Sequence, residues 1–171
     1  MLKKNLFIVL FCCITGFATA QARNQEADLK AVFIYNFTYY IDWDSSYLSN
    51  DFVIGVIGFS PVTASLNEIA KSNKVNNKKI IIRVFDKPGD IESCQILFIP
   101  AKLSYSLSSI LEKVDKGMLT ISEQPGYASK GTAFNFVLIN NKLKFEANLK
   151  TISSGGLKAS SQLLKLAIII Q

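Results

Sequence analysis

The residues that carry most enzyme chemistry are scarce in this chain. Histidine is absent from all 171 residues, which removes the commonest general base and the commonest transition-metal ligand. Of the three cysteines, Cys12 and Cys13 lie in an apolar N-terminal segment, so Cys94 is the one thiol outside it. An intramolecular disulfide, a zinc site and a catalytic triad are therefore not expected in the body of the chain.

Paired carboxylates are the remaining candidates for acid–base catalysis. Asp42 lies two residues from Asp44, and Asp86 lies close to Asp90 and Glu92. Both groups fall in polar, turn-like segments, where nothing apolar would raise the pKa of a carboxyl group toward neutrality. We expect solvated loop acids, and a hydrolase that uses them is the least favoured hypothesis. No enzymatic activity, cofactor or metal site is predicted.

Two further nucleophile types have simple structural interpretations. Ser160 and Ser161 are adjacent, but neither an elbow motif nor a base accompanies them. Cys94 directly precedes an apolar run, where a small buried hydrophobic side chain is expected. The alternative for Cys94 is a redox-sensing thiol, which would act through an intermolecular bond or a reversible oxidised form.

The N-terminus carries an export signal. A basic pair precedes the apolar run 6–17, and the A-x-A pattern that ends at Ala20 follows. The run is shorter than the roughly 20 residues of a membrane span, and no stop-transfer pattern follows it. We expect a signal peptide over residues 1–20 with cleavage after Ala20. A lipoprotein is less favoured, because Phe11 precedes Cys12 where a small residue is required.

The mature chain, residues 21–171, is expected to be a single α/β domain in the periplasm. Its 151 residues suffice for one sizeable core. Loss of the two leader lysines lowers the formal net charge from +6 to +4, and the basic excess is spread thinly. No basic stripe interleaved with aromatic residues indicates a nucleic-acid groove. A mild positive charge would instead favour an acidic partner or an anionic membrane surface.

Strands and helices alternate along most of the mature chain. Four apolar runs have the length of buried strands: 52–57, 79–85, 95–99 and 118–121. Helical patterns separate them, and this order is typical of βαβ units. Two alternating segments around Asn140-Asn141 then predict a hairpin. We expect a three-layer α/β sandwich with a mixed, mostly parallel sheet of about six strands, a C-terminal antiparallel hairpin and helices on both faces.

Amphipathic helices are expected at both ends of the mature chain. The N-terminal stripe comprises Leu29, Val32, Phe33, Phe37 and Tyr40. Asn36 lies inside this stripe, so we expect its amide to be buried, where it would pin a neighbouring loop or line a pocket. The C-terminal helix is expected from Lys158 to about Ala167, and its anchors are Leu163, Leu164 and Leu166.

Six segments occur in a fixed order from about Leu29 to Ala167. They are Leu29–Phe37 leading to Trp43, Ser93–Ile99, Leu119–Ala128 with Gly131, Phe134–Val137, Phe145–Leu149 and Gly156–Ala167. Together they resemble the YfiR family of periplasmic proteins, and the last segment is the most similar. Better-known members have further cysteines that form disulfides. This chain departs from that pattern, so an internal redox bridge is not expected.

The resemblance implies a compact α/β regulator that represses an inner-membrane diguanylate cyclase by binding its periplasmic part. Release of the cyclase would raise cyclic di-GMP and favour biofilm formation. A sensor kinase is an equal candidate partner, because the fold of this chain does not define the output domain of its partner. The chain is also a candidate to form a homodimer. The candidate partner or pocket residues are Asn36, Asn135, Glu146, Asn148, Lys158, Ser160 and Ser161, with Cys94 as the redox candidate and Gly126 and Gly131 as further matches.

Two binding hypotheses follow. In the first, apolar surface near the C-terminal helix contacts an inner-membrane signalling protein. In the second, the chain is a small-molecule sensor or carrier that acts with a sensor kinase and binds its ligand at the carboxyl ends of the parallel strands.

Overall fold

The computed structural model describes residues 25–48 and 51–170. The predicted signal peptide, residues 1–20, lies outside the described residues. Within the described ranges, no helix combines the length and the apolar character needed to cross a membrane.

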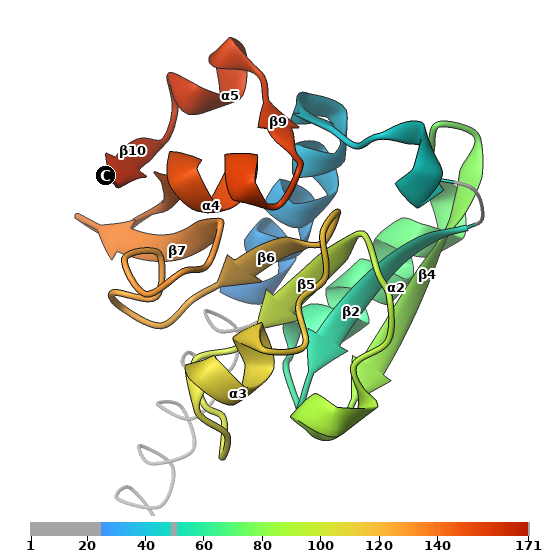
Figure 1. The fold of residues 1–171 in the computed structure, drawn as a ribbon, viewed down its shortest axis with the longest axis horizontal. Helices are drawn as coiled ribbons and strands as arrows, with labels where there is room; N and C mark the ends of the chain where they lie inside the picture. Colours follow the sequence, from blue (N-terminus) through green and yellow to red (C-terminus); the bar gives the residue numbers. More distant parts are fainter. Residues whose placement is uncertain (1–24, 49–50, 171) are drawn as a thin grey trace, which may run out of the picture.

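A mixed sheet of eight strands forms the centre of the molecule, in the order β10-β8-β7-β6-β5-β2-β4-β3 (Figure 1). Five neighbouring strands, from β7 to β4, run parallel, whereas β8 is antiparallel to β7 and β3 is antiparallel to β4. The strands are β2 (Phe52–Ile57), β3 (Lys74–Val75), β4 (Lys78–Phe85), β5 (Ile96–Ile99), β6 (Leu119–Ser122), β7 (Phe134–Ile139), β8 (Lys142–Asn148) and β10 (Ile168–Ile170). A separate antiparallel pair joins β1 (Ile41–Asp42) to β9 (Lys158–Ala159).

Helices cover both faces of the sheet, as the sequence predicts. The N-terminal helix, residues 25–40, and α2 (Val62–Ser72) share one apolar cluster with β2 and β5. On the opposite face, α3 (Leu107–Leu111) packs against a second cluster. Alternate residues of a strand point to opposite faces, so Phe98 belongs to the first cluster and Leu97 to the second. The remaining helices are η1 (Ser45–Leu48), η2 (Pro88–Asp90), α4 (Leu149–Ser154) and α5 (Ser161–Leu164).

Two asparagine pairs form the tight turns of the sheet. Asn140 and Asn141 have φ values of 50° and 58° and join β7 to β8. Asn76 and Asn77, with φ values of 48° and 63°, join β3 to β4 in the same way. Two successive residues with positive φ give the turn whose twist suits a two-residue hairpin, and asparagine tolerates that conformation. The predicted C-terminal hairpin is therefore confirmed.

An aromatic cluster fixes the N-terminal helix to this hairpin. The ring of Phe37 lies 4.7 Å from that of Phe134 and 5.0 Å from that of Phe145, measured between centroids. Phe33 adds edge-on contacts to Phe136 and Phe145. Such aromatic pairs contribute about 0.5–1.5 kcal/mol each beyond the area they bury. The helix that carries part of the candidate site is thus held rigidly against the sheet.

The C-terminal helix predicted from Lys158 to about Ala167 is wrong in its extent, because only α5 (Ser161–Leu164) is helical, with Leu163 buried as expected. Lys158 and Ala159 instead pair with β1, and Ser160 caps α5, which is a single turn. The chain then returns to the sheet as β10, whose three isoleucines suit a strand. Leu166, expected as an anchor, is 71% exposed. The pairing of β9 with β1 and of β10 with β8 outweighs the local helical pattern.

Candidate functional site

The carboxyl ends of β2 and β5 open a cleft at one edge of the sheet. After β2 the chain crosses to β4 on one side, whereas after β5 it crosses to β6 on the other. Open α/β sheets place ligand-binding crevices at such a topological switch point. The cleft has a volume of about 390 Å³, and its walls follow β2, β5 and β6 and include the start of the N-terminal helix.

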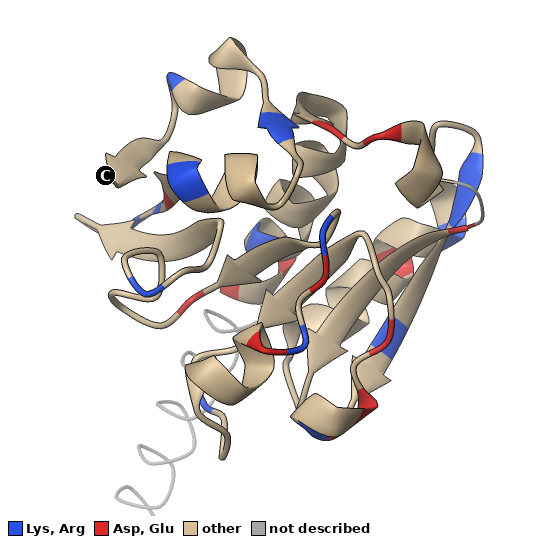
Figure 2. Ribbon diagram, in the orientation of Figure 1, with Lys and Arg blue, Asp and Glu red and all other residues tan. Residues whose placement is uncertain are grey.

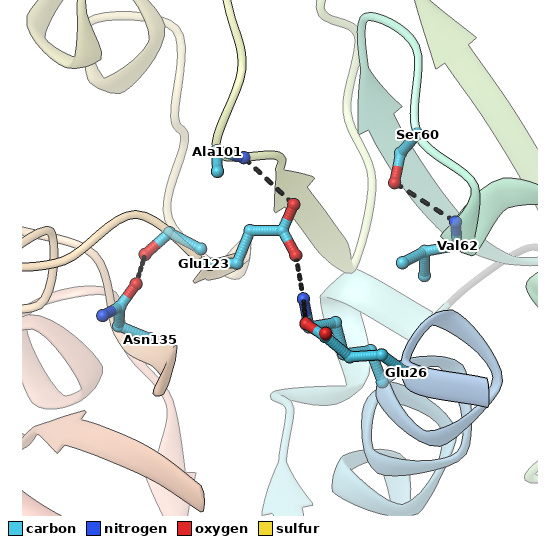
Figure 3. Close-up of polar contacts among 8 residues, drawn as sticks. Glu26, Ser60, Val62, Ala101, Glu123 and Asn135 are labelled. Carbon is cyan, nitrogen blue, oxygen red and sulfur yellow. Dashed lines mark hydrogen bonds and ion pairs between the residues drawn. The ribbon is translucent and has the colours of Figure 1, made fainter. Parts of the chain in front are cut away.

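Three charged residues stand at one wall of the cleft and form what we call the ion triad: Glu26, Lys30 and Glu123. The Nζ atom of Lys30 lies 2.5 Å from a carboxylate oxygen of Glu26 and 2.5 Å from one of Glu123. The second oxygen of Glu123 accepts a hydrogen bond from the backbone N–H of Ala101, at 3.0 Å (Figure 3). Glu123 therefore ties the end of β6 both to the N-terminal helix and to the loop after β5.

Lys30 is held in its protonated form. Burial by itself lowers the pKa of Lys30, but hydrogen bonds to Glu123 and Glu26 and their negative charges outweigh that effect, so the pKa is raised above its usual 10.5. Two carboxylates share one ammonium, which leaves the ion triad with a formal charge of −1. Lys102 also lines the cleft, but it is exposed. The triad can therefore accept a further positive charge.

The loop after β2 forms the facing wall. Gly58 begins it with φ of 69°, and a side chain at Gly58 would come within 2.9 Å of Leu103. The buried hydroxyl of Ser60 accepts a hydrogen bond from the N–H of Val62, which fixes the entry into α2 (Figure 3). Phe59, held between these two points, is 86% exposed. A fixed loop thus presents a large aromatic side chain to solvent at the mouth of the cleft.

Two further hollows adjoin the cleft and share its walls. The hollow beside α2 and β4 shares Phe59, Ser60 and Pro61 with it, and the hollow beside the β7–β8 hairpin shares the ion triad. Their volumes are about 380 Å³ and 440 Å³. We call the three hollows together the edge groove. It runs along the carboxyl ends of the parallel strands.

Two of the family-matched residues, Asn135 and Glu146, belong to a buried hydrogen-bond network. Asn135 is fully buried, and its Oδ1 accepts a hydrogen bond from Ser122 at 2.8 Å. Its Nδ2 donates to Glu146 at 2.9 Å, and Thr132 lies 2.8 Å from the Ser122 hydroxyl. These bonds join β6, β7 and β8. A buried amide whose oxygen and nitrogen are both hydrogen-bonded fixes strand positions, so this network supports the fold.

Asn148 and Ser160 are helix caps. The Oδ1 of Asn148 accepts a hydrogen bond from Thr151 N at the start of α4, and its Nδ2 donates to the carbonyl of Ala128. The Oγ of Ser160 accepts from Leu163 N at the start of α5. Replacing such a cap by alanine commonly costs about 1 kcal/mol.

Lys158 and Ser161, the other two C-terminal candidates, are exposed beside this cap. Lys158 lies in β9 opposite Asp42. Ser161 is the first residue of α5, and neither Ser161 nor Lys158 lines the cleft. Contact of these two residues with a partner stays a prediction.

The expectation that Asn36 is buried is wrong, because its side chain is exposed. The N-terminal helix turns Ala27, Ala31, Ile34 and Phe37 toward the sheet. Leu29 and Val32, assigned from their spacing to the buried face, are each 44% exposed. A role of Asn36 in holding a loop within the core is excluded, whereas contact with a partner stays a prediction.

The acidic pairs considered for catalysis lie in solvent. The Asp44 carboxylate accepts hydrogen bonds from the N–H and the hydroxyl of Ser46, which lower its pKa. Glu92 pairs with Arg83, and Asp90 lies 3.9 Å from Lys87. Charges of both signs are dispersed over the ribbon (Figure 2). Among the described residues, no three potential ligands converge to hold a metal ion.

Cys94 lies in the loop that leads into β5, and its side chain is buried in the second apolar cluster. Burial raises the pKa of its thiol to about 12, despite a backbone hydrogen bond at Gly55 and the charge of Arg83, which both act the other way. A side chain at Gly55 would lie 2.6 Å from Phe85 and 3.1 Å from the Cys94 sulfur. Cys94 therefore fills space as a neutral thiol, and a redox role for it stays a prediction.

The sequence predicted the place of the cleft but not its residues. The carboxyl ends of the parallel strands are the expected pocket position; Glu123 directly follows β6, and Ser60 is the third residue after β2. The sequence does not reveal the ion triad, because Lys30 and Glu123 are 93 residues apart along the chain. The signal available was the position of polar residues immediately after each parallel strand.

Comparison with known proteins gives one result. The model of a family described as YfiR/HmsC-like matches residues 27–168, which includes the buried network and all of the edge groove except Glu26. No curated protein matches the chain.

Proposed function

Because the chain belongs to the YfiR/HmsC-like family, we propose that it is a periplasmic regulatory protein that represses a membrane-bound diguanylate cyclase. The family match is the observation that carries this proposal. In this role the protein binds the periplasmic part of the cyclase and keeps cyclic di-GMP low. Signals that release the cyclase then raise cyclic di-GMP and favour attachment to surfaces.

The character of the described polar groups supports a binding role. Within the described ranges, the loop acids Asp42, Asp44, Asp86, Asp90 and Glu92 are exposed, and the Cys94 thiol is neutral. At the cleft, Lys30 is held between two carboxylates as an ammonium, so it is not free to take up a proton. Such an arrangement recognises charge and shape, which is what a regulator needs.

A deletion strain tests the proposal. Loss of the gene should raise cyclic di-GMP and increase surface attachment, and a plasmid copy with its leader should restore both. A copy without residues 1–20 should fail to restore them, because the protein would stay in the cytoplasm. Unchanged cyclic di-GMP in the deletion strain would refute repression of a cyclase.

The cleft at the switch point favours a second candidate, a periplasmic small-molecule sensor or carrier that acts with a sensor kinase. Its volume of about 390 Å³ falls in the range of ligand pockets. A thermal-shift screen of periplasmic metabolites against the mature protein tests it, since a true ligand stabilises the folded state by mass action. A screen without any concentration-dependent shift would remove this candidate.

A further inference from the structure

We propose that the edge groove binds an extended segment of the partner's periplasmic part, with a Lys or Arg side chain at the ion triad and apolar side chains in both outer hollows. This inference rests on the proposed function, from which it takes the partner. The edge groove, rather than apolar surface near the C-terminal helix, is then the expected contact with the partner.

The shape of the groove favours an extended occupant. Three hollows of similar volume share walls in sequence, first at Phe59, Ser60 and Pro61 and then at the ion triad. A compact ligand would fill one hollow and leave the others empty. An extended peptide places successive side chains at regular intervals, so several of them can enter neighbouring hollows.

A carboxylate oxygen left unpaired by Lys30 in the middle of the groove favours a basic side chain there, even though the exposed Lys102 also lines the cleft and balances the charge of the ion triad. The ion triad has two carboxylates for one ammonium. Glu26 binds Lys30 through Oε1 and is 40% exposed, which leaves Oε2 able to accept a hydrogen bond from an incoming cation. Complementary charge of this kind contributes mainly to specificity and to the rate of association.

Both ends of the groove offer apolar side chains that stand in solvent. Phe59 is 86% exposed and Val84 is 51% exposed at the end beside α2, and Leu138 is 58% exposed at the hairpin end. Exposed apolar residues gathered at a groove mark interaction surfaces, and aromatic side chains often carry most of the binding energy there. Phe59 is accordingly the main anchor for the partner.

Titration of the purified mature protein with the purified periplasmic part of the cyclase from the same cell tests the groove. Phe59→Ala should weaken binding about tenfold or more, as expected for an aromatic anchor. Glu26→Gln should weaken binding by a smaller factor, about threefold, and should reduce its dependence on salt concentration. Both side chains are exposed enough that the fold should survive, which the melting temperature of each variant checks.

Two matched substitutions outside the groove serve as controls. Leu166→Ala truncates another exposed apolar side chain, and Glu68→Gln neutralises an exposed carboxylate that pairs with Lys71 on α2. Both should bind the cyclase as the wild type does. A binding loss for Leu166→Ala together with normal binding by Phe59→Ala would place the contact near β10 and overturn the groove proposal.

Overlapping peptides that span the periplasmic part of the cyclase identify the occupant. The peptide that binds should contain Lys or Arg between apolar residues, and Phe59→Ala should abolish its binding. Wild-type protein that binds the whole domain while Phe59→Ala and Glu26→Gln bind equally well refutes the groove and leaves the proposed function intact. Wild-type protein that does not bind the domain at all refutes the proposed function itself.

Discussion

The interior of the sheet and its carboxyl edge hold polar side chains in opposite ways. In the interior, Asn135 is fully buried and bonds to Ser122 and Glu146. At the edge, Lys30 is paired with two carboxylates, and one of these, Glu26, remains 40% exposed. The interior groups bond to one another inside the sheet, whereas Glu26 at the edge keeps part of its carboxylate exposed. Buried groups that bond to one another fix the fold, and exposed charged groups can bind a ligand.

Ser122 and Glu123 show this contrast in adjacent residues. Ser122 ends β6 and directs its hydroxyl into the buried network. Glu123 is the first residue after the strand, and its carboxylate reaches Lys30 and the backbone of Ala101. The end of the strand is thus the boundary between the two regions. Measurements of stability and of binding on single variants should show which residues belong to the buried interior and which belong to the edge.

The largest expected effect concerns the interior thiol. The pKa of Cys94 is raised from 9.0 to about 12 by burial, so the folded state favours the protonated form. The stability this contributes is complete below pH 9 and is lost as the pH rises toward 12. At about 1.4 kcal/mol per pKa unit, the full loss is about 4 kcal/mol.

Urea unfolding of the wild type and of Cys94→Ala at a series of pH values from 8 upward measures that loss. The difference in unfolding free energy should shift by about 2 kcal/mol in favour of Cys94→Ala between about pH 9 and pH 10.5. Other groups titrate in both proteins and cancel in the difference. Parallel pH curves would mean that the thiol ionises as freely in the folded protein as in the unfolded chain.

The next effect tests the buried network. Asn135→Leu removes an amide that bonds to both Ser122 and Glu146 and leaves those groups with one partner fewer in the interior. The free energy of unfolding should fall by about 2–4 kcal/mol. Urea unfolding measures it, and binding of the cyclase by the protein that remains folded should be unchanged. A loss of binding with normal stability would show that Asn135 contributes to binding of the cyclase and not to the stability of the fold.

The sheet could be predicted because its signals are local. β2 is predicted with its observed bounds, since the run 52–57 is almost wholly apolar and lies between Asn50-Asp51 and Gly58. The hairpin followed from Asn140-Asn141, where two residues must adopt positive φ. In both cases a few neighbouring residues determine the structure, so no knowledge of distant contacts is needed.

The C-terminus and the first helix could not be predicted in the same way. The segment that begins at Lys158 has helical spacing, but its pairing with β1 depends on residues more than a hundred positions earlier. In the first helix, spacing alone favoured the large residues Leu29 and Val32, whereas Ala27 and Ala31 allow the helix to approach the sheet closely. Close packing rather than side-chain size decides which face is buried.

The smallest effect tests the edge. Lys30→Met removes the ammonium and leaves Glu123, which is 15% exposed, beside Glu26 without compensation. We expect the free energy of unfolding to fall by about 1–2 kcal/mol, less than for a fully buried pair, because solvent still reaches the carboxylates. The matched control is Lys71→Met, whose pair with Glu68 is 67% and 71% exposed. That change should cost less than about 0.5 kcal/mol. Equal losses of unfolding free energy for Lys30→Met and Lys71→Met would show that the ion triad contributes no more than an exposed surface ion pair. The ion triad would then not differ from the rest of the surface.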